Sequence, residues 1–270
     1  MKRFIAVAGN VGVGKSTLTY LLSEYLFWEP FFEAVDDNPY LADFYQDMRT
    51  WSFQSQVFFL SKRLSHHRQI IERPGTVVQD RTVYEDAEIF ARNLYLQGNM
   101  NARDWRSYWD LYQTVITILP PPDLVIYLQA SVPVLRERIR LRGRDYEQQI
   151  EPEYLTQLND LYEAWVDGFG LCPVLTIPTD CLNYVTDNSL LELIASRVLE
   201  KLHGKEVVLV TPEQVEEISP GVDPVLVSSA TEASSLATPS LRAQEASQAK
   251  ARQTFHPAPW QDQPRANQPC

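Results

Sequence analysis

The chain has 270 residues, a hydrophobic fraction of 44% and a formal net charge of -11 at pH 7. This length is sufficient for one sizeable α/β domain with an appendage. The acidic balance argues against a protein that binds nucleic acid through its phosphates, although an uncharged nucleoside is still a suitable ligand. No apolar run approaches the length needed to cross a bilayer, so no membrane partner is expected.

Cysteine and histidine give no metal motif. The 3 cysteines have no CxxC spacing, which favours reduced thiols in a cytoplasmic protein over a zinc site or a disulfide framework. Two adjacent histidines, His66 and His67, point to different sides of a helix and are not expected to bind a metal together. We expect this pair to be solvated.

The strongest motif lies near the start of the chain. An apolar run at residues 4–8 is followed by G-x-x-x-x-G-K-S at residues 9–16 and by a helix-forming run at residues 18–25. This order is typical of a phosphate-binding loop and opposes a glycine-rich turn that only joins a strand to a helix. Glycine allows the backbone conformations that turn N–H groups inward around an anion.

The motif assigns chemistry to individual residues. We expect Lys15 to reach the β- and γ-phosphates of a nucleotide and the Ser16 hydroxyl to bind Mg²⁺. The residues expected to surround the phosphates are Gly9, Asn10, Val11, Gly12, Val13, Gly14, Lys15, Ser16 and Thr17.

Short apolar runs alternate with runs of helical periodicity up to about residue 203. Further strands are expected at residues 31–35, 76–80, 123–128 and 174–177. Further helices are expected at residues 40–45, 51–72, 84–96, 101–119, 132–142, 153–165 and 188–202. This alternation predicts an α/β fold with a parallel, five-stranded sheet and helices on both faces, which binds ligands at the carboxyl ends of the strands.

The composition changes at about residue 204. Residues 204–270 are rich in Ser, Thr, Ala, Gln and Pro, a composition that buries too little apolar surface to offset chain entropy. We therefore expect one domain at residues 1–203 and a mostly disordered tail without a catalytic role. A partner-binding segment around residues 255–260 is the alternative.

Several arginines lie in and just after the helix expected at residues 132–142. Arg138 and Arg142 are four residues apart and share a helix face, and Arg144 follows on a loop. Guanidinium groups fixed near a transferring phosphate stabilise its developing charge. We interpret this segment as a mobile lid over the nucleotide, against the alternative of a solvated helix whose arginines pair with acids such as Glu137.

Three charged residues follow expected strands at the ligand-binding edge of the sheet. Glu33 could accept a proton from a hydroxyl that is being phosphorylated, or could be an ordinary residue at the end of a strand. Asp80 and Arg81 could form an ion pair, or Asp80 could hold Mg²⁺ while Arg81 orients substrate and phosphate.

Taken together, residues 2–203 resemble the deoxynucleoside kinase family, and its bacterial deoxyadenosine/deoxyguanosine kinase branch in particular. The resemblance rests on the phosphate loop and on three further motifs in the right order. These are E-A-V-D-D-N-P-Y-L from Glu33, D-R-T-V-Y-E-D from Asp80 and R-G-R-D-Y-E from Arg142. Many relatives have Glu-Arg-Ser where this chain has Asp80-Arg81-Thr82, and the segment expected to hold the donor base, residues 180–184, matches only loosely.

The resemblance implies a P-loop kinase fold and a role for each matching residue. It implies that Glu33 is the general base for the 5′-hydroxyl, that Arg81 supports Glu33, and that Ser16 and Asp80 hold Mg²⁺. The residues implied to bind the deoxynucleoside are Glu33, Leu41, Tyr45, Gln56, Arg63, Arg81, Asp86, Phe90 and Glu147. Gln56, Arg63 and Asp86 would read the base, Phe90 would stack on it, and Tyr45 with Glu147 would hold the sugar 3′-hydroxyl. Arg138, Arg142 and Arg144 match the arginines of the lid.

The activity implied is transfer of the γ-phosphoryl group of ATP, with Mg²⁺, to a deoxynucleoside, with deoxyadenosine or deoxyguanosine preferred. Alternatives are a preference for deoxycytidine or a broad specificity for deoxynucleosides, a kinase for another small hydroxyl or phosphate acceptor, and a non-catalytic nucleotide-binding subunit. The resemblance also implies a homodimer that packs through the helices expected at residues 51–72 and 101–119.

Overall fold

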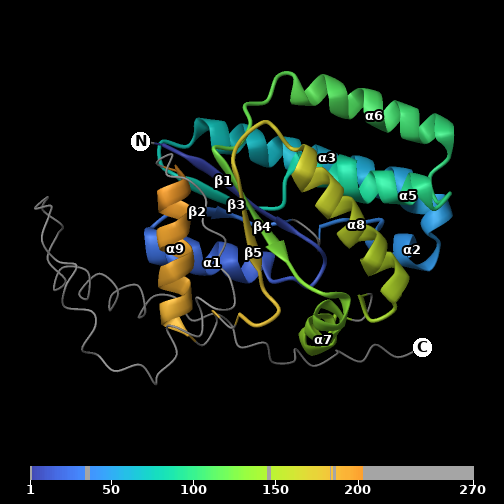
Figure 1. Ribbon diagram of the computed structural model, residues 1–270. Coiled ribbons are helices and arrows are strands. Elements are labelled where there is room, and N and C mark those ends of the chain that lie inside the picture. The colour runs from blue at the N-terminus through green and yellow to red at the C-terminus, as the bar shows by residue number, and fades with distance from the viewer. Residues whose placement is uncertain (1, 34–36, 145–146, 183, 185–186, 203–270) are drawn as a thin grey trace, which may run out of the picture. The chain divides into compact units, whose positions relative to one another are not determined.

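Parallel strands form the central sheet of the structure, which is a computed structural model (Figure 1). The structure describes residues 2–33, 37–144, 147–182, 184 and 187–202. The sheet has five strands, in the order β2-β3-β1-β4-β5. They are β1 (Phe4–Gly9), β2 (Glu29–Phe31), β3 (Val77–Asp80), β4 (Leu124–Gln129) and β5 (Val174–Pro178). All neighbouring strands pair in parallel, which confirms the predicted sheet.

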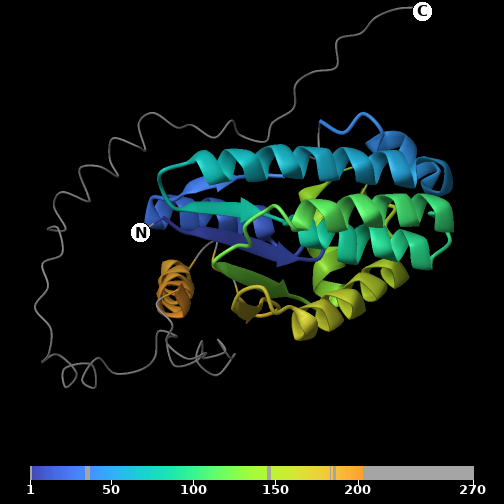
Figure 2. The same cartoon turned by 90° about the horizontal axis from the view of Figure 1, so that it is seen from above.

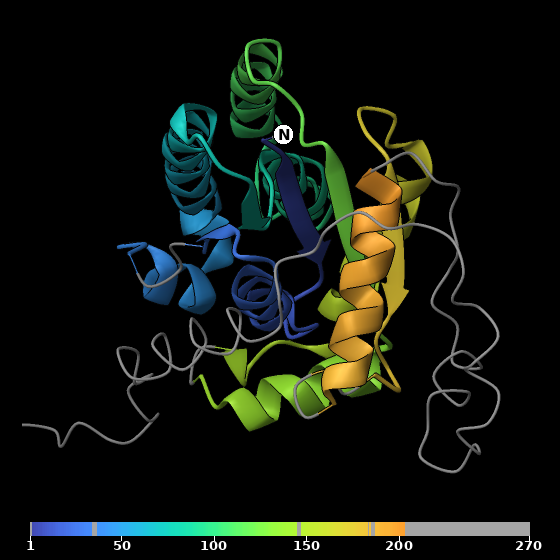
Figure 3. The ribbon, with the colours of Figure 1, turned by 90° about the vertical axis from the view of Figure 1, so that its left-hand side faces the viewer.

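Helices cover both faces of the sheet. The first face carries α1 (Lys15–Leu26) and α9 (Asn188–Leu202), which lie together in Figure 3. The second face carries a layer in which α3, α5 and α6 lie side by side (Figure 2). The helices on this side are α2 (Leu41–Gln46), α3 (Met48–Glu72), α4 (Val83–Glu85), α5 (Arg92–Leu96), α6 (Ala102–Ile116) and α8 (Pro152–Gly168).

The central strand β1 contributes to two separate apolar cores. Ile5 and Val7 pack into the core beneath α1 and α9, whereas Ala6 and Ala8 face the core of the second layer. Successive side chains of a strand point to opposite faces, so this single strand anchors both layers. Its carboxyl end, fully buried, leads directly into the phosphate loop.

Local sequence determines the ends of several helices. The Asp47 carboxylate accepts a hydrogen bond from the Thr50 N–H at the start of α3, and Asn101 caps α6 in the same way. Helix α7 (Val132–Arg142) has a proline in its first turn and ends at Gly143, whose φ of 71° lies in the left-handed region. The predicted bounds of α7 and α9 are confirmed.

The second strand does not lie where the sequence predicted it. β2 ends at Phe31 instead of spanning residues 31–35, and its ladder to β3 runs from Glu29 opposite Val77 to Phe31 opposite Gln79. Pro30 is tolerated because β2 is an edge strand, where one N–H group needs no partner in the sheet. Glu33 therefore lies in the segment that leaves the sheet, and residues 34–36 fall outside the described part of the chain.

The helix predicted at residues 84–96 is also interrupted. Between α4 and α5 the segment Asp86–Ala91 is a π-helix, η1, which local periodicity did not indicate. Single π-helical turns inside helices are frequent at functional sites. Tertiary contacts must compensate for the strain and lost hydrogen bonds of such a turn, so helical spacing alone does not predict it.

The prediction for the histidine pair was wrong for His67. Its side chain is buried and its Nε2 lies 2.9 Å from the carbonyl oxygen of Pro120. His66 is half-buried, with its ring edge-on to Phe31. The residues of the predicted tail, 204–270, lie outside the described part of the chain. Among the described residues, no helix is long and apolar enough to span a membrane.

Candidate active site

The phosphate loop lies between the end of β1 and the start of α1. Gly12 and Gly14 have φ values of 82° and 108°, in the region that favours glycine. A Cβ atom on Gly12 would lie 2.7 Å from Ile139 Cγ1 and 3.0 Å from the carbonyl oxygen of Leu135, so helix α7 packs against the loop. Because α1 begins at Lys15, its free N–H groups and helix dipole face the loop and favour an anion there.

Lys15 is held inside the loop by backbone carbonyls. Its Nζ atom donates to Gly9 O at 2.8 Å and to Asn10 O at 3.0 Å. Burial, together with the nearby Arg81, lowers the pKa of Lys15 to about 8. A phosphate would supply the negative charge that this buried ammonium group needs.

Ser16 and Asp80 meet at the edge of the sheet beside the loop. Ser16 Oγ donates to Asp80 Oδ2, whereas Asp80 Oδ1 is buried with no hydrogen-bond partner among the described residues. Hydroxyl and carboxylate oxygens are ligands that Mg²⁺ prefers, and substrate phosphates and water usually complete its shell. In the described part of the chain, no group of three or more His, Cys, Asp or Glu residues could hold a metal ion by itself. The residues present therefore fit a magnesium ion shared with substrate phosphates.

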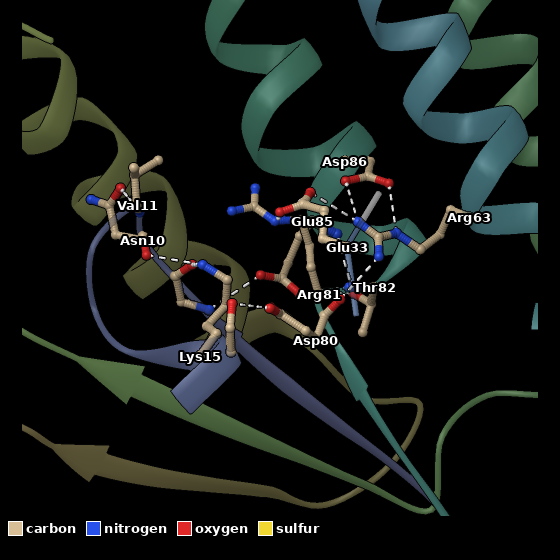
Figure 4. Close-up of polar contacts among 12 residues, drawn as sticks. Asn10, Val11, Lys15, Glu33, Arg63, Asp80, Arg81, Thr82, Glu85 and Asp86 are labelled. Atoms are coloured by element: carbon tan, nitrogen blue, oxygen red, sulfur yellow. Dashed lines mark hydrogen bonds and ion pairs between the residues drawn. The ribbon is translucent and has the colours of Figure 1, made fainter. Parts of the chain in front are cut away.

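A second cluster of charged side chains lies beside the loop (Figure 4). Arg63 donates to Glu33 Oε1 at 3.1 Å, to Asp86 Oδ2 at 3.0 Å and to the carbonyl oxygen of Asp80 at 3.0 Å. Arg81 forms an ion pair with the same Glu33 oxygen at 3.1 Å. The cluster thus joins three separate segments: the chain after β2, helix α3 and the end of β3.

The charges around Glu33 keep its carboxyl group ionised. Burial alone would raise the pKa of Glu33, but Arg81, Arg63 and Lys15 outweigh burial and hold this pKa below its usual range. The balance differs at Asp86, where burial exceeds the effect of Arg63 and raises the pKa. Glu33 can therefore accept a proton at neutral pH.

Arg81 has an unusual backbone conformation. Its φ of 67° is in the left-handed region, and its N–H donates to the carbonyl oxygen of Val7 at 2.9 Å. Its guanidinium carbon lies 4.0 Å from the centre of the Phe90 ring, a cation–π contact. Such strained residues persist where several contacts hold them and are frequent at active sites.

The arginines of the expected lid do not act alike. Arg142 and Arg144 both form ion pairs with Glu147, and the pair between Arg144 and Glu147 has a distance of 3.4 Å. Arg138 instead donates to Val13 O at 3.0 Å and to Thr179 O at 2.6 Å, so it ties the phosphate loop to the segment after β5. On the outer surface, Arg140 pairs with Glu137 at 2.7 Å, as the solvated-helix interpretation expected for this part of α7.

These groups surround one cavity of ≈ 290 Å³. Most of the predicted site residues line it: Val11, Gly12, Lys15, Ser16, Glu33, Leu41, Tyr45, Gln56, Asp80, Arg81, Asp86, Phe90, Arg142, Arg144 and Glu147. The predicted residues that do not line it are Gly9, Asn10, Val13, Gly14, Thr17, Arg63 and Arg138. Arg63 nevertheless belongs to the site, because it lies behind the cavity wall and holds both Glu33 and Asp86.

Several residues of the site were not predicted from the sequence. Phe32, Phe44, Phe59 and Tyr154 also line the cavity. Tyr154, on α8, has no local motif that separates it from other helical tyrosines. Glu85, by contrast, lies inside the D-R-T-V-Y-E-D motif and contacts the phosphate loop, so the motif could have identified it.

A phosphate loop and an ion-paired carboxylate that share one cavity at the carboxyl edge of a parallel sheet define a phosphoryl-transfer enzyme. The sequence model of the family described as "Deoxynucleoside kinase" matches residues 5–203. The chain belongs to this family, whose members phosphorylate deoxynucleosides.

Individual relatives agree with this assignment. The deoxyadenosine/deoxycytidine kinase of Bacillus subtilis is 38% identical over 204 residues, which cover 75% of this chain and 94% of that protein. The deoxyguanosine kinase of the same organism is 34% identical, with 73% and 96% covered. A solved structure of deoxyadenosine kinase from M. mycoides with bound dATP has 32% identity and a TM-score of 0.62, with 73% and 99% covered. The predicted P-loop kinase fold is confirmed.

Proposed function

We propose that this protein transfers the γ-phosphoryl group of ATP to the 5′-hydroxyl of a purine deoxynucleoside, deoxyadenosine or deoxyguanosine, in nucleotide salvage. One observation supports this most strongly. A single cavity is lined by the phosphate-loop residues Lys15 and Ser16, by the ionised carboxylate of Glu33 and by the carboxamide of Gln56. Donor, acceptor and base would then meet in one cavity.

In the proposed reaction, Glu33 accepts the proton of the 5′-hydroxyl while the oxygen attacks the γ-phosphorus and the bond to the ADP oxygen breaks. Arg81 and Arg63 hold the Glu33 carboxylate in place from two sides. Lys15 leaves the loop carbonyls to bind the phosphates, and Arg142 and Arg144 neutralise the charge that develops on the transferred group. Mg²⁺, when bound by Ser16 and Asp80, would neutralise the β- and γ-phosphates.

Gln56 supports recognition of the base. Its side chain is 4% exposed, and it forms no hydrogen bond with another residue of the described segments. A carboxamide donates and accepts at once, which complements the N6 and N7 edge of adenine. Cytosine also offers one donor beside one acceptor, so a deoxycytidine preference is the second candidate. The curated relative named as a deoxyadenosine/deoxycytidine kinase agrees with either base.

The remaining substrate contacts of this proposal follow the family resemblance. Asp86, which Arg63 holds from behind the cavity wall, would complete the base edge, and Phe90 would stack on the base. Tyr45 and Glu147 would hold the 3′-hydroxyl, with Leu41 as an apolar wall; all three line the cavity. A kinase for an unrelated hydroxyl would have no use for this combination, and a non-catalytic subunit would have no need for the ionised Glu33.

The test is a steady-state assay with Mg-ATP against deoxyadenosine, deoxyguanosine, deoxycytidine, thymidine and adenosine. We expect the highest kcat/KM for a purine deoxynucleoside. A higher value for deoxycytidine would favour the second candidate, and no turnover of any deoxynucleoside would refute the proposal.

The same proposal includes a cytoplasmic homodimer that packs through α3 and α6. Support comes from apolar side chains on this layer, where Leu111 is 43% exposed and Ile118, just after α6, is 76% exposed. We expect light scattering to give a dimer for the wild-type protein and a monomer for Leu111→Glu. Tyr25→Glu, an exposed position on α1 across the sheet, should remain dimeric. A monomeric wild-type protein would refute this part.

A further inference from the structure

Glu85 is a buried carboxylate that no step of the proposed reaction uses. It is the last residue of α4, it is 0% exposed, and it is adjacent to Asp86 of the acceptor cluster. Burial raises the pKa of Glu85 although Arg81 and Lys15 oppose this effect. A buried acid of this kind is costly to the fold unless hydrogen bonds satisfy it.

The two oxygens of Glu85 bind different parts of the site (Figure 4). Oε2 accepts from the Thr82 N–H at 2.8 Å, and the Thr82 hydroxyl accepts in turn from the Glu85 N–H at 3.3 Å, which forms a capping box. Oε1 accepts from the Gly9 N–H at 3.1 Å and lies 2.8 Å from the Tyr162 hydroxyl. One carboxylate therefore links the segment after β3 to the first glycine of the phosphate loop.

Tyr162 completes the link from helix α8. Its hydroxyl lies 2.8 Å from Gly9 O as well as 2.8 Å from Glu85 Oε1. The single hydroxyl proton is donated to one of these two oxygens at a time, so Glu85 engages the Gly9 N–H, and Tyr162 is within hydrogen-bond distance of the Gly9 carbonyl. Gly9 O is also an acceptor for Lys15, so Tyr162 would still hold this carbonyl after Lys15 moves to the phosphates.

We propose that Glu85 and Tyr162 are positioning residues, which fix the first glycine of the phosphate loop relative to the Asp80–Asp86 segment and so align the donor phosphate with the acceptor hydroxyl. The proposal rests on the proposed kinase function. It predicts that loss of these contacts disturbs the donor side of the reaction more than the binding of the deoxynucleoside, because the Arg63 contacts to Glu33 and Asp86 do not involve Glu85.

Glu85→Gln is the most specific test of the carboxylate, because it keeps the shape of the side chain. Either orientation of the carboxamide places its NH₂ group against a backbone N–H, that of Gly9 or that of Thr82, and one buried donor loses its acceptor. Glu88→Gln is the matched control on the same segment. Glu88 is half-buried and accepts from the hydroxyl of Tyr112, so a glutamine can keep its oxygen toward that tyrosine.

The experiment measures kcat, KM for ATP and KM for the deoxynucleoside, together with the equilibrium affinity for Mg-ATP and Tm, in full-length variants. We expect Glu85→Gln to lower kcat/KM for ATP about tenfold or more, the usual effect of an unsatisfied buried group. KM for the deoxynucleoside should change by less than about twofold, and Glu88→Gln should match the wild type in every constant. Tyr162→Phe should show the same pattern with a smaller loss.

Several outcomes would overturn the proposal. These are an unchanged kcat/KM for ATP in folded Glu85→Gln, an equal loss of kcat/KM for both substrates in this variant, or a loss that Glu88→Gln shares. If Glu85→Gln does not fold, Tyr162→Phe, which loses only one oxygen, decides the question by the same criterion. If the wild type turns over no deoxynucleoside, the proposed function fails, and the affinities of the variants for Mg-ATP still decide the role of Glu85.

Discussion

The donor and acceptor halves of the site are built in different ways. The donor half is one contiguous stretch, residues 9–17, in which backbone N–H groups and glycine conformations make the anion site. The acceptor half is assembled from side chains that follow β2 and β3 or lie on α3 and η1. The first half therefore depends on backbone shape, and the second depends on the balance of buried charges.

This difference has an energetic consequence. When one partner of a buried ion pair is removed, the other is left as an uncompensated buried charge. The free-energy cost of that charge is usually larger than the net stabilisation that the intact pair provided. Arg63, at 3% exposed, contacts two acids of the acceptor half at once. Substitutions in this half should therefore change chemistry and charge, whereas substitutions in the loop should change geometry.

The largest expected effect is that of Glu33→Gln, which isolates the chemistry of the acceptor half. The variant keeps the shape of the side chain but cannot accept the proton of the hydroxyl, so kcat should fall by about 10²–10⁴-fold. KM for the deoxynucleoside should change little. Glu29→Gln, at a half-buried glutamate of β2 paired with Arg73, is the control and should retain wild-type kcat. A near-normal kcat in Glu33→Gln would show that another group is the base.

The next effect is that of Gly12→Ala, which isolates the backbone of the donor half. The added Cβ would meet Ile139 and the carbonyl oxygen of Leu135 at a residue whose φ is 82°. Strain of this kind costs about 1–3 kcal/mol, so kcat/KM for ATP should fall by about 5- to 150-fold. Gly75→Ala is the control, because nothing lies within 4 Å of its added Cβ. Equal kinetics in the two variants would contradict the importance of loop geometry.

A smaller effect concerns pH and tests the charge balance of the acceptor half directly. Because Arg81, Arg63 and Lys15 hold the pKa of Glu33 below its usual value of 4.5, the carboxylate stays ionised as the pH falls toward that value. We expect kcat/KM for the deoxynucleoside to change by less than about twofold between pH 7 and pH 5. Circular dichroism over the same range separates activity from acid unfolding. Because burial raises the pKa of Asp86, a midpoint of the acidic limb above 5 in folded protein would contradict this interpretation of Glu33 only where Asp86→Asn keeps the same midpoint.

The same difference explains what the sequence could predict. The phosphate loop could be predicted as one stretch because its residues are contiguous and their order is a physical requirement, and the structure has this stretch between β1 and α1. Helices α7 and α9 were bounded correctly because a proline, a glycine and helical periodicity are local features. Glu33 and Arg81 could be proposed from their places after expected strands, but Gln56 and Arg63 could be assigned only through the family resemblance, because nothing near them in the sequence indicates a cavity.

The failures share one cause, which is dependence on distant contacts. β2 ends at Phe31 because its pairing with β3 stops there, not because the apolar run ends. His67 is buried because its ring contacts the backbone carbonyl oxygen of Pro120, which is 53 residues away in the sequence. Arg138 faces Val13 and Thr179 because loops that are far apart in sequence meet beside α7. Local patterns carry no information about such partners.

The smallest expected effect is that of removing residues 204–270, which would show whether both halves of the site are complete without them. The cavity residues lie between Val11 and Tyr154, and the family match ends at residue 203. We therefore expect a protein that ends at residue 203 to keep kcat and both KM values within about twofold, a change of about 0.5 kcal/mol. Truncation within α9, after Leu190, is the control and should destabilise the fold, because Leu191, Ile194 and Val198 would be lost from the core. A large loss of kcat/KM in the protein that ends at residue 203 would mean that the removed segment contributes to one half of the site, and the substrate whose KM rises would identify which half.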